Sequence, residues 1–250
     1  MAKITKPKKA RAKKAVRKDA WWFRPLSWLK RWLWRGVVFV SVFVGFVILL
    51  HTVMNPARTY YMISEEHRLG AVDREWVPLE EIAPVMARSV VAAEDVNFCL
   101  HWGFDMGAIR AALAEGGARG ASTLSQQTVK NVYLWQGRNW TRKALEAVLT
   151  PLVELVWSKR RIIEVYLNVA EFDEGVFGVE AAARHYFGVG PEALSASQAA
   201  HLAAILPSPK TRSASRPSKR VRRRAIAIAD GAATIRRDGR ADCFEDRAPG

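Results

Sequence analysis

One uninterrupted apolar run near the N-terminus constrains this chain more than any other feature. From Gly36 to Leu50 no residue is charged, and Ser41 is the only polar one. Extended to Met54, the run has about 19 residues, and as a helix it spans about 28 Å, close to the thickness of a bilayer's hydrocarbon core. The sequence therefore predicts a single transmembrane helix at residues 36–54.

The residues before this run predict its orientation. Residues 1–35 hold thirteen Lys or Arg and one acid, so most of the chain's net charge of +15 lies there. Positive charge on one side of a span predicts a cytoplasmic N-terminus, and Trp28, Trp32 and Trp34 suit the interfacial aromatic belt. A cleaved signal peptide is the alternative, but the apolar core is long for one and no small-x-small site follows it. Residues 55–250 are then expected outside the cytoplasmic membrane.

The same charge distribution argues against one class of function. Once the basic head of residues 1–35 is set aside, the remaining chain is close to neutral. A basic head that marks membrane topology needs no nucleic acid to explain it. Nucleic-acid binding is therefore a distant alternative, and we expect no nucleic-acid partner.

The exported part predicts a mainly helical domain. Strand signals are scarce, whereas apolar residues recur at helical spacing, most clearly on one stripe at residues 152–167. Ser195 with Gln198 forms a capping-box pattern, and Pro84 suits a first helical turn. Ser122 or Thr123 is predicted to cap the helix that carries Gln126, Gln127 and Lys130. We expect a membrane-proximal linker at 55–74 and a helical domain at 75–210.

Residues 211–250 have a different composition. Pro217 could begin a last helix that runs to about residue 235, and the terminal DGRADCFEDRAPG is predicted to be disordered. The basic run at 219–224 is interpreted as a solvated helix face, which near an anionic membrane would also aid docking. Cys99 and Cys243 are expected as two buried or free thiols, with a disulfide between them as the weaker alternative.

Three polar clusters interrupt the apolar helical pattern. An acid beside an apolar wall, such as Glu94, has its pKa raised toward neutrality, which suits a general base or acid. An acid among cations, such as Glu146, stays ionised. Amides and a lysine on a capped helix suit sugar hydroxyls and phosphate oxygens, so together the clusters favour glycosyl transfer from a lipid-linked sugar. The clusters are Glu94, Asp95 and His101; Ser122, Thr123, Gln126, Gln127, Lys130 and Asn131; and Arg138, Arg142, Lys143 and Glu146.

These clusters and two later segments resemble the peptidoglycan glycosyltransferases of glycosyltransferase family 51. The resemblance covers about residues 75–210, with five sequence blocks in the family's order. The matching residues are Glu94, Asp95, Phe98, His101 and Gly103; Gly120, Ser122, Thr123, Gln126, Gln127, Lys130 and Asn131; Arg142, Lys143 and Glu146; Lys159, Ile162, Glu164, Tyr166, Leu167 and Asn168; and GVFGVEAAARHYFG at 175–188.

The resemblance implies a lysozyme-like, mainly α fold with a smaller membrane-proximal lobe, which follows the single N-terminal transmembrane helix predicted from the apolar run. Asp173 departs from the family pattern, which usually has Gly there, and Cys99 stands where an aromatic residue is common. Only 40 residues follow residue 210, so we expect no penicillin-binding domain. The chain looks like a monofunctional enzyme of the bacterial inner membrane with a periplasmic catalytic domain.

The implied reaction is the polymerisation of lipid II into β-1,4-linked glycan strands with release of undecaprenyl diphosphate. Glu94 is expected to take the proton from the acceptor 4-hydroxyl, and Glu146 to stand near the donor diphosphate, orienting basic residues or helping to hold Mg²⁺. Inversion predicts carboxylates roughly 6.5–9.5 Å or more apart. The residues expected to bind substrate are Ser122, Thr123, Gln126, Gln127, Lys130, Arg138, Arg142 and Lys143.

Two other interpretations stay open at this point. A membrane-anchored lytic enzyme that cleaves glycan strands would share the fold and one catalytic glutamate, but it would not need basic residues around a diphosphate. A non-enzymatic scaffold would hold cell-wall synthesis or division proteins through the span and the basic head. Such proteins are also candidate partners of an enzyme, beside lipid II, the growing glycan strand and the inner membrane.

Overall fold

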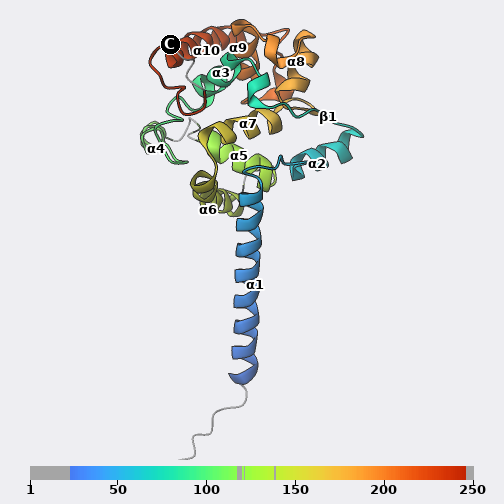
Figure 1. The fold of residues 1–250 in the computed structure, drawn as a ribbon, viewed down its shortest axis with the longest axis vertical. Helices are drawn as coiled ribbons and strands as arrows, with labels where there is room; N and C mark the ends of the chain where they lie inside the picture. The colour runs from blue at the N-terminus through green and yellow to red at the C-terminus, as the bar shows by residue number, and fades with distance from the viewer. Residues whose placement is uncertain (1–22, 117–119, 121, 138, 246–250) are drawn as a thin grey trace, which may run out of the picture. The chain divides into compact units, whose positions relative to one another are not determined.

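The computed structural model of the chain describes residues 23–116, 120, 122–137 and 139–245 (Figure 1). The chain divides into two compact units, residues 1–45 and 46–250. The first helix, α1, runs from Phe23 to Leu50. Its segment Ser27–Leu50 has 24 residues and is long and apolar enough to cross a membrane, by length and composition. As a helix that segment is about 36 Å long, which exceeds the thickness of the hydrocarbon core.

The predicted span of residues 36–54 extends beyond the end of this helix. Helix α1 stops at Leu50, and the next residues form a turn. Arg161 explains why the chain leaves the helix there, because its guanidinium donates to the carbonyl oxygens of His51 at 3.0 Å and Met54 at 2.8 Å. Local hydropathy cannot register this contact with a residue more than 100 positions away in sequence.

The segment 55–74, predicted as a linker, contains a helix of its own. Helix α2 spans Tyr60–Leu69, and the Thr59 side chain accepts from the backbone N–H of Met62 to cap it. Gly70 ends the helix in the left-handed conformation (φ 86°), which glycine adopts without a steric penalty. The folded body therefore begins earlier than the predicted boundary at residue 75.

The body is mostly helical, as the sequence predicts. Helices α3, α9 and α10 pack against one another, while α5 packs against both α6 and α7 (Figure 1). Among the residues that the structure describes, three short 3₁₀ helices lie in the connections. The α-helices are α3 (Pro84–Glu94), α4 (Met106–Ala114), α5 (Leu124–Tyr133), α6 (Trp140–Val156), α7 (Lys159–Val169), α8 (Val179–Phe187), α9 (Ala196–Ile205) and α10 (Lys219–Arg237), and the 3₁₀ helices are η1 (Leu79–Glu81), η2 (Pro191–Ala193) and η3 (Pro209–Thr211).

A small sheet of three strands, in the order β1-β3-β2, accompanies these helices. Its strands are β1 (Asp73–Arg74), β2 (Glu171–Asp173) and β3 (Val176–Phe177). Strand β3 pairs antiparallel with β2 and parallel with β1. Gly175 lies in the tight turn between β2 and β3 with φ +74°, and a side chain there would meet Leu69 at 2.9 Å.

The predicted helix starts are confirmed where a capping signal supports them. Thr123 and Ser195 are N-caps with complete capping boxes, completed by Gln126 and Gln198 respectively. Pro84 occupies the first turn of α3, where its missing N–H costs nothing. These starts depend on residues three positions apart, so the local sequence is enough to predict them.

The predicted single stripe at residues 152–167 is wrong. The structure breaks it at Trp157, and Ser158 caps the new helix α7 by accepting from the backbone N–H of Arg161. Ile162, Ile163, Tyr166 and Leu167 are buried, but Leu152, Leu155 and Val156 on α6 are exposed. The apolar spacing fits both helices, yet each helix directs its apolar residues to different surroundings.

The predicted disorder of the C-terminal tail is also wrong for residues 238–245. Cys243 forms a disulfide with Cys99, so the expectation of two thiols was incorrect. Phe244 is buried against Phe98, with ring centroids 6.2 Å apart, and Glu245 accepts two hydrogen bonds from Arg88. The polar composition of this segment predicted disorder, but it gave no weight to Phe244, which packs in the core, or to Cys243, which forms the cross-link. The rest of the predicted tail, residues 246–250, lies outside the described residues.

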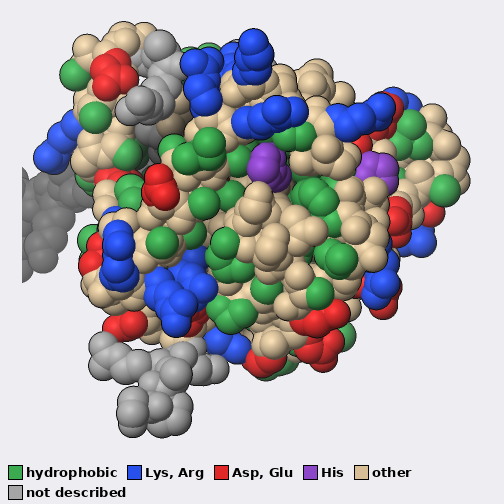
Figure 2. Space-filling view, turned by 90° about the horizontal axis from the view of Figure 1, so that it is seen from above, with side chains coloured by type: hydrophobic (Ala, Val, Ile, Leu, Met, Phe, Trp, Pro, Cys, Tyr) green, Lys and Arg blue, Asp and Glu red, His purple; other side chains and the backbone are tan. Residues whose placement is uncertain are grey.

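The basic run at 219–224 is only partly a solvated face. Arg222 and Arg223 are exposed on α10, whereas Arg224 is half-buried. On the face of the body seen in Figure 2, Lys and Arg side chains form several separate groups with acidic side chains between them. The view shows no continuous basic stripe of the kind that tracks a nucleic-acid backbone.

Candidate active site

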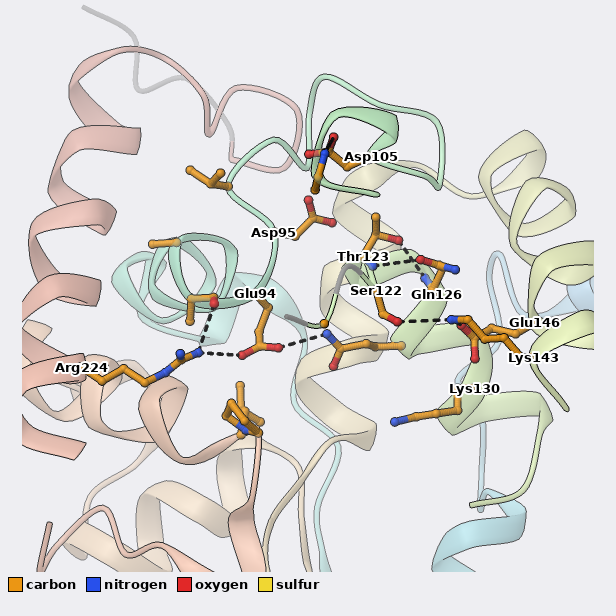
Figure 3. A pocket seen from close by; sticks show the side chains of 18 of the residues that line it. Glu94, Asp95, Asp105, Ser122, Thr123, Gln126, Lys130, Lys143, Glu146 and Arg224 are labelled. Atoms are coloured by element: carbon orange, nitrogen blue, oxygen red, sulfur yellow. Dashed lines mark hydrogen bonds and ion pairs between the residues drawn. The ribbon is translucent and has the colours of Figure 1, made fainter. Parts of the chain in front are cut away.

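A cavity of about 920 Å³ brings together the sequence-predicted residues (Figure 3). It lies where the end of α3, the start of α5, the first half of α6 and one residue of α10 meet. Arg138, the remaining predicted site residue, lies outside the described residues. The predicted residues that line the cavity are Glu94, Ser122, Thr123, Gln126, Gln127, Lys130, Arg142, Lys143 and Glu146.

Glu94 is the last residue of α3, and its carboxylate is held from two sides. Gln127 donates to Oε2 at 3.1 Å, and Arg224 donates to Oε1 at 3.2 Å. The side chain is only 14% exposed, and burial raises the pKa of the Glu94 carboxyl above its usual range. The hydrogen bond from Gln127 and the nearby charges of Arg224, Lys130 and Arg212 act against this rise in pKa.

Asp95 uses both of its carboxylate oxygens for contacts within the fold. Its Oδ1 lies 2.8 Å from Nε2 of His101, and its Oδ2 accepts from the backbone N–H of Leu124 at 2.9 Å. Leu124 is the first residue of α5, so Asp95 joins the end of α3 to the start of α5. Both contacts lie within the fold, so they give Asp95 and His101 a structural role.

Gly103, in the first sequence block, allows a close approach that a side chain would prevent. Its φ is +82°, and a Cβ there would lie 2.7 Å from Thr150 on α6. Its carbonyl oxygen accepts from the Thr123 hydroxyl at 2.6 Å. The loop after Asp95 is therefore packed directly between α5 and α6.

Helix α5 supplies the middle of the cavity. Thr123 and Gln126 form the capping box at the start of this helix. Gln127, one position later, donates a hydrogen bond to the Glu94 carboxylate. Burial lowers the pKa of Lys130, and the charge of Arg142 lowers it further. The carboxylates of Glu146 and Glu94 both raise it, so the Lys130 ammonium lies within electrostatic reach of each acid.

Helix α6 places Glu146 in surroundings unlike those of Glu94. Glu146 is 2% exposed and pairs with Arg142, whose Nη1 lies 2.9 Å from Oε2, and with Lys143. Lys143 also donates to the Ser122 hydroxyl at 3.2 Å. Arg142 and Lys143 lie three or four positions before Glu146 on the same helix, and Ser122 lies at the start of α5. The cluster of Arg142, Lys143 and Glu146 therefore forms one compact charged wall of the cavity.

Arg224 is a site residue that the sequence analysis missed. Its Nη2 donates to Glu94 and also, at 3.2 Å, to the carbonyl oxygen of Ala93. A signal was present, because Val221, Ala225 and Ile228 form the buried stripe of α10 and Arg224 lies at its edge. The neighbouring arginines hid it, since a run of like charges is ordinarily a solvated face.

The residues present do not form a protein-held Mg²⁺ site. The described part of the chain contains no group of three or more His, Cys, Asp or Glu side chains placed to share a metal ion. Both oxygens of Glu146, the expected ligand, already bind cationic side chains. Mg²⁺ commonly binds through substrate phosphates with few protein ligands, so a role for the ion stays a prediction.

Comparison with known proteins agrees with this geometry. The transglycosylase family model matches residues 62–233, which include every described residue of the cavity. A biosynthetic peptidoglycan transglycosylase of Jannaschia sp. (strain CCS1) is 61% identical over 216 residues, covering 86% of this chain and 90% of the relative. One of Yersinia pseudotuberculosis serotype IB (strain PB1/+) is 49% identical over 201 residues, covering 74% and 82%. The chain therefore belongs to the transglycosylase family.

Proposed function

We propose that the chain, a peptidoglycan glycosyltransferase of cell-wall synthesis, polymerises lipid II with Glu94 as the base and Glu146 on the donor side. One observation carries the assignment of roles: both carboxylates line the same cavity in opposite surroundings. Glu94 lies where burial disfavours its charge, whereas Glu146 is paired with two cations. Such divergence separates an acid that accepts a proton from one that holds cationic side chains in place.

On the acceptor side, the carboxylate of Glu94 takes the proton from the 4-hydroxyl of the incoming GlcNAc. The raised pKa of Glu94 makes it a stronger base than an exposed glutamate, and the donor amide of Gln127 holds one oxygen in place. The oxygen that loses its proton attacks the anomeric carbon of the donor sugar. The new bond is β because attack comes from the face opposite the α-linked leaving group.

On the donor side, the bond between the anomeric carbon and the diphosphate breaks as the new bond forms. Negative charge then grows on the lipid diphosphate, and preorganised cations stabilise it most effectively in a partly buried site. Lys130, Arg142 and Lys143 line the cavity for this purpose, and Glu146 fixes the last two in position. We assign Arg138 the same role because it precedes this basic cluster in the sequence.

The enzyme is anchored by α1 in the bacterial inner membrane, with the body in the periplasm, where lipid II carries its sugars. The basic head of residues 1–35 supports a cytoplasmic N-terminus. The Cys99–Cys243 disulfide supports the same topology, because disulfides persist in the oxidising periplasm and are rare in the cytosol. Other cell-wall synthesis or division proteins are candidate partners for positioning it.

Incubating the full-length protein in detergent or vesicles separately with lipid II and with isolated sacculi tests the function. We expect polymeric glycan from lipid II, inhibition by a diphosphate-mimicking inhibitor such as moenomycin, and no soluble fragments from sacculi. Fragments from sacculi without polymer from lipid II would instead support the lytic interpretation.

The pH profile of chain growth should depend on Arg224. Glu94 must be ionised to act, so the rate should fall as pH drops through its raised pKa. The charge of Arg224 lowers that pKa, so Arg224→Gln should move the acidic limb of the pH–rate profile to higher pH. The rate at constant lipid II concentration from pH 5 to 9 measures this.

The matched control is Arg222→Gln, which removes the same charge from an exposed position of α10. It should leave the acidic limb where it is. An acidic limb that stays fixed in Arg224→Gln would show that Glu94 does not set the profile.

A further inference from the structure

A second cavity of about 420 Å³ lies outside the proposed catalytic machinery. Its volume falls within the range of small-ligand sites. It is formed by the end of β2, the end of α8 and the segment that follows α9. The lining residues that matter here are Asp173, Lys210, Arg212, Ser213, Ser215 and Arg216.

Positive charge dominates this second cavity, and part of it is uncompensated. Lys210 is bound to Glu65 at 2.8 Å and to Glu171 at 3.4 Å, so its charge is used within the fold. Arg212 donates only to a carbonyl oxygen, that of Ala204 at 3.0 Å, in the described part of the chain. Neither Arg212 nor the exposed Arg216 has a carboxylate partner among the residues described. Two guanidinium groups are thus available to an anion.

The cavity also contains one carboxylate, on the residue that departs from the family pattern. Oδ2 of Asp173 accepts from the Tyr186 hydroxyl at 2.9 Å and faces Nε2 of His185 at 3.1 Å. Its Oδ1 accepts from the backbone N–H of Glu174 and keeps a free lone pair. Asp173 would repel a simple anion such as phosphate. The charges of the cavity therefore favour a ligand that carries carboxylate groups for the two arginines and also an ammonium group for Asp173.

The segment after α9 connects this second cavity to the active site. Leu206 and Pro207 line the large cavity, and the residues 210–213, 215 and 216 line the second one. Burial is the main influence on the pKa of both Arg212 and Glu94, yet each of their charges also favours the ionised form of the other. The second cavity therefore lies on the side of Glu94, which is the acceptor side in the proposed mechanism.

We propose that the second cavity binds the stem peptide of the acceptor, with peptide carboxylates on Arg212 and Arg216 and the free amino group of a diamino acid on Asp173. This inference rests on the proposed use of lipid II as acceptor. The peptide is attached to the sugar next to the acceptor GlcNAc, so a site beside Glu94 is within its reach. Asp173 then selects the peptide, while the chemistry stays with Glu94.

Four lipid II substrates test this in steady-state polymerisation: the natural stem with a free side-chain amine, the same stem with that amine acetylated, a stem with its terminal carboxylate amidated, and a stem with both changes. Asp173→Asn should raise KM about threefold to tenfold for the free-amine substrates and leave KM for the acetylated ones unchanged. Arg216→Gln should raise KM by a similar factor for the substrates with a free terminal carboxylate and leave KM unchanged for those with a terminal carboxamide. We expect kcat to change little, because neither side chain meets the reacting atoms.

Matched controls are Glu174→Gln, which removes an acid next to Asp173 but outside the lining, and Arg222→Gln on the exposed face of α10. Neither should change selectivity among the four substrates. Equal KM effects of Asp173→Asn on free and acetylated amines, or no effect on any substrate, would overturn the peptide site while polymerisation stands. If the unmodified enzyme polymerises none of the four, the proposed function itself fails.

Discussion

Glu94→Gln should lower the rate of glycan chain growth by about 10²- to 10⁴-fold, the usual contribution of a general base. Glutamine keeps the shape of the side chain, but its single acceptor oxygen can accept from Gln127 or Arg224 and not from both, and it cannot accept the proton of the 4-hydroxyl. Binding of lipid II should remain within about twofold, because Glu94 is only one of many polar groups around the substrate. Single-turnover polymerisation and a separate equilibrium binding measurement give the two quantities.

The same variant should not unfold more easily at neutral pH. Burial raises the pKa of Glu94 in the folded state, so its contribution to stability is present below the unfolded pKa and is lost as pH rises through the folded value. A neutral glutamine removes a charge that burial disfavours. Glu81→Gln, at an exposed position, serves as the control for loss of one acid. Polymerisation by Glu94→Gln at the parent rate would refute the base assignment.

Breaking the Cys99–Cys243 disulfide should lower the free energy of unfolding of the body by about 2–4 kcal/mol. The bond joins residues 144 positions apart, so reduction releases a long loop in the unfolded chain. It also frees the tail, whose Phe244 packs on Phe98 and whose Glu245 pairs with Arg88. Urea unfolding of the full-length protein in detergent, with and without dithiothreitol, measures the loss.

The double variant Cys99→Ser with Cys243→Ser is the matched control, because it should unfold alike in both conditions. Phe244→Ala with the disulfide intact separates the effect of packing from that of cross-linking. Loss of this buried aromatic ring should lower the free energy of unfolding by about 3–5 kcal/mol. If dithiothreitol leaves the unfolding midpoint of the parent protein unchanged, the tail does not stabilise the body through this bond.

Much of the active-site cavity could be predicted from sequence, because its residues come from short blocks with local constraints. Thr123 and Gln126 cap their own helix, and Arg142 and Lys143 reach Glu146 within one helical turn. Spacing of three or four residues places side chains on one face of a helix without any tertiary information. That Glu94 and Glu146 line one cavity was a hypothesis until the fold brought the end of α3 to α6.

The partners of Glu94 show where sequence patterns stop being informative. Gln127 and Arg224 lie 33 and 130 positions from it, and only the packing of α3 against α10 selects Arg224 from the arginines around it. The folded tail is a similar case, because its order depends on the distant Cys99 and Phe98. Local composition describes how polar a segment is, and it does not state what the segment will contact.

By itself the amino-acid sequence determined the long apolar N-terminal helix, the helical class of the body, the capped helix starts and the residue types of the candidate active site, since each of these follows from periodicity or from neighbours within one helical turn. The tertiary structure alone decided where α1 ends, that the tail is cross-linked to the loop after Asp95, and that Arg224 faces Glu94. The reason is physical: contacts between residues more than 100 positions apart form only when helices pack, and neither charge nor hydropathy along the chain specifies which residues will meet.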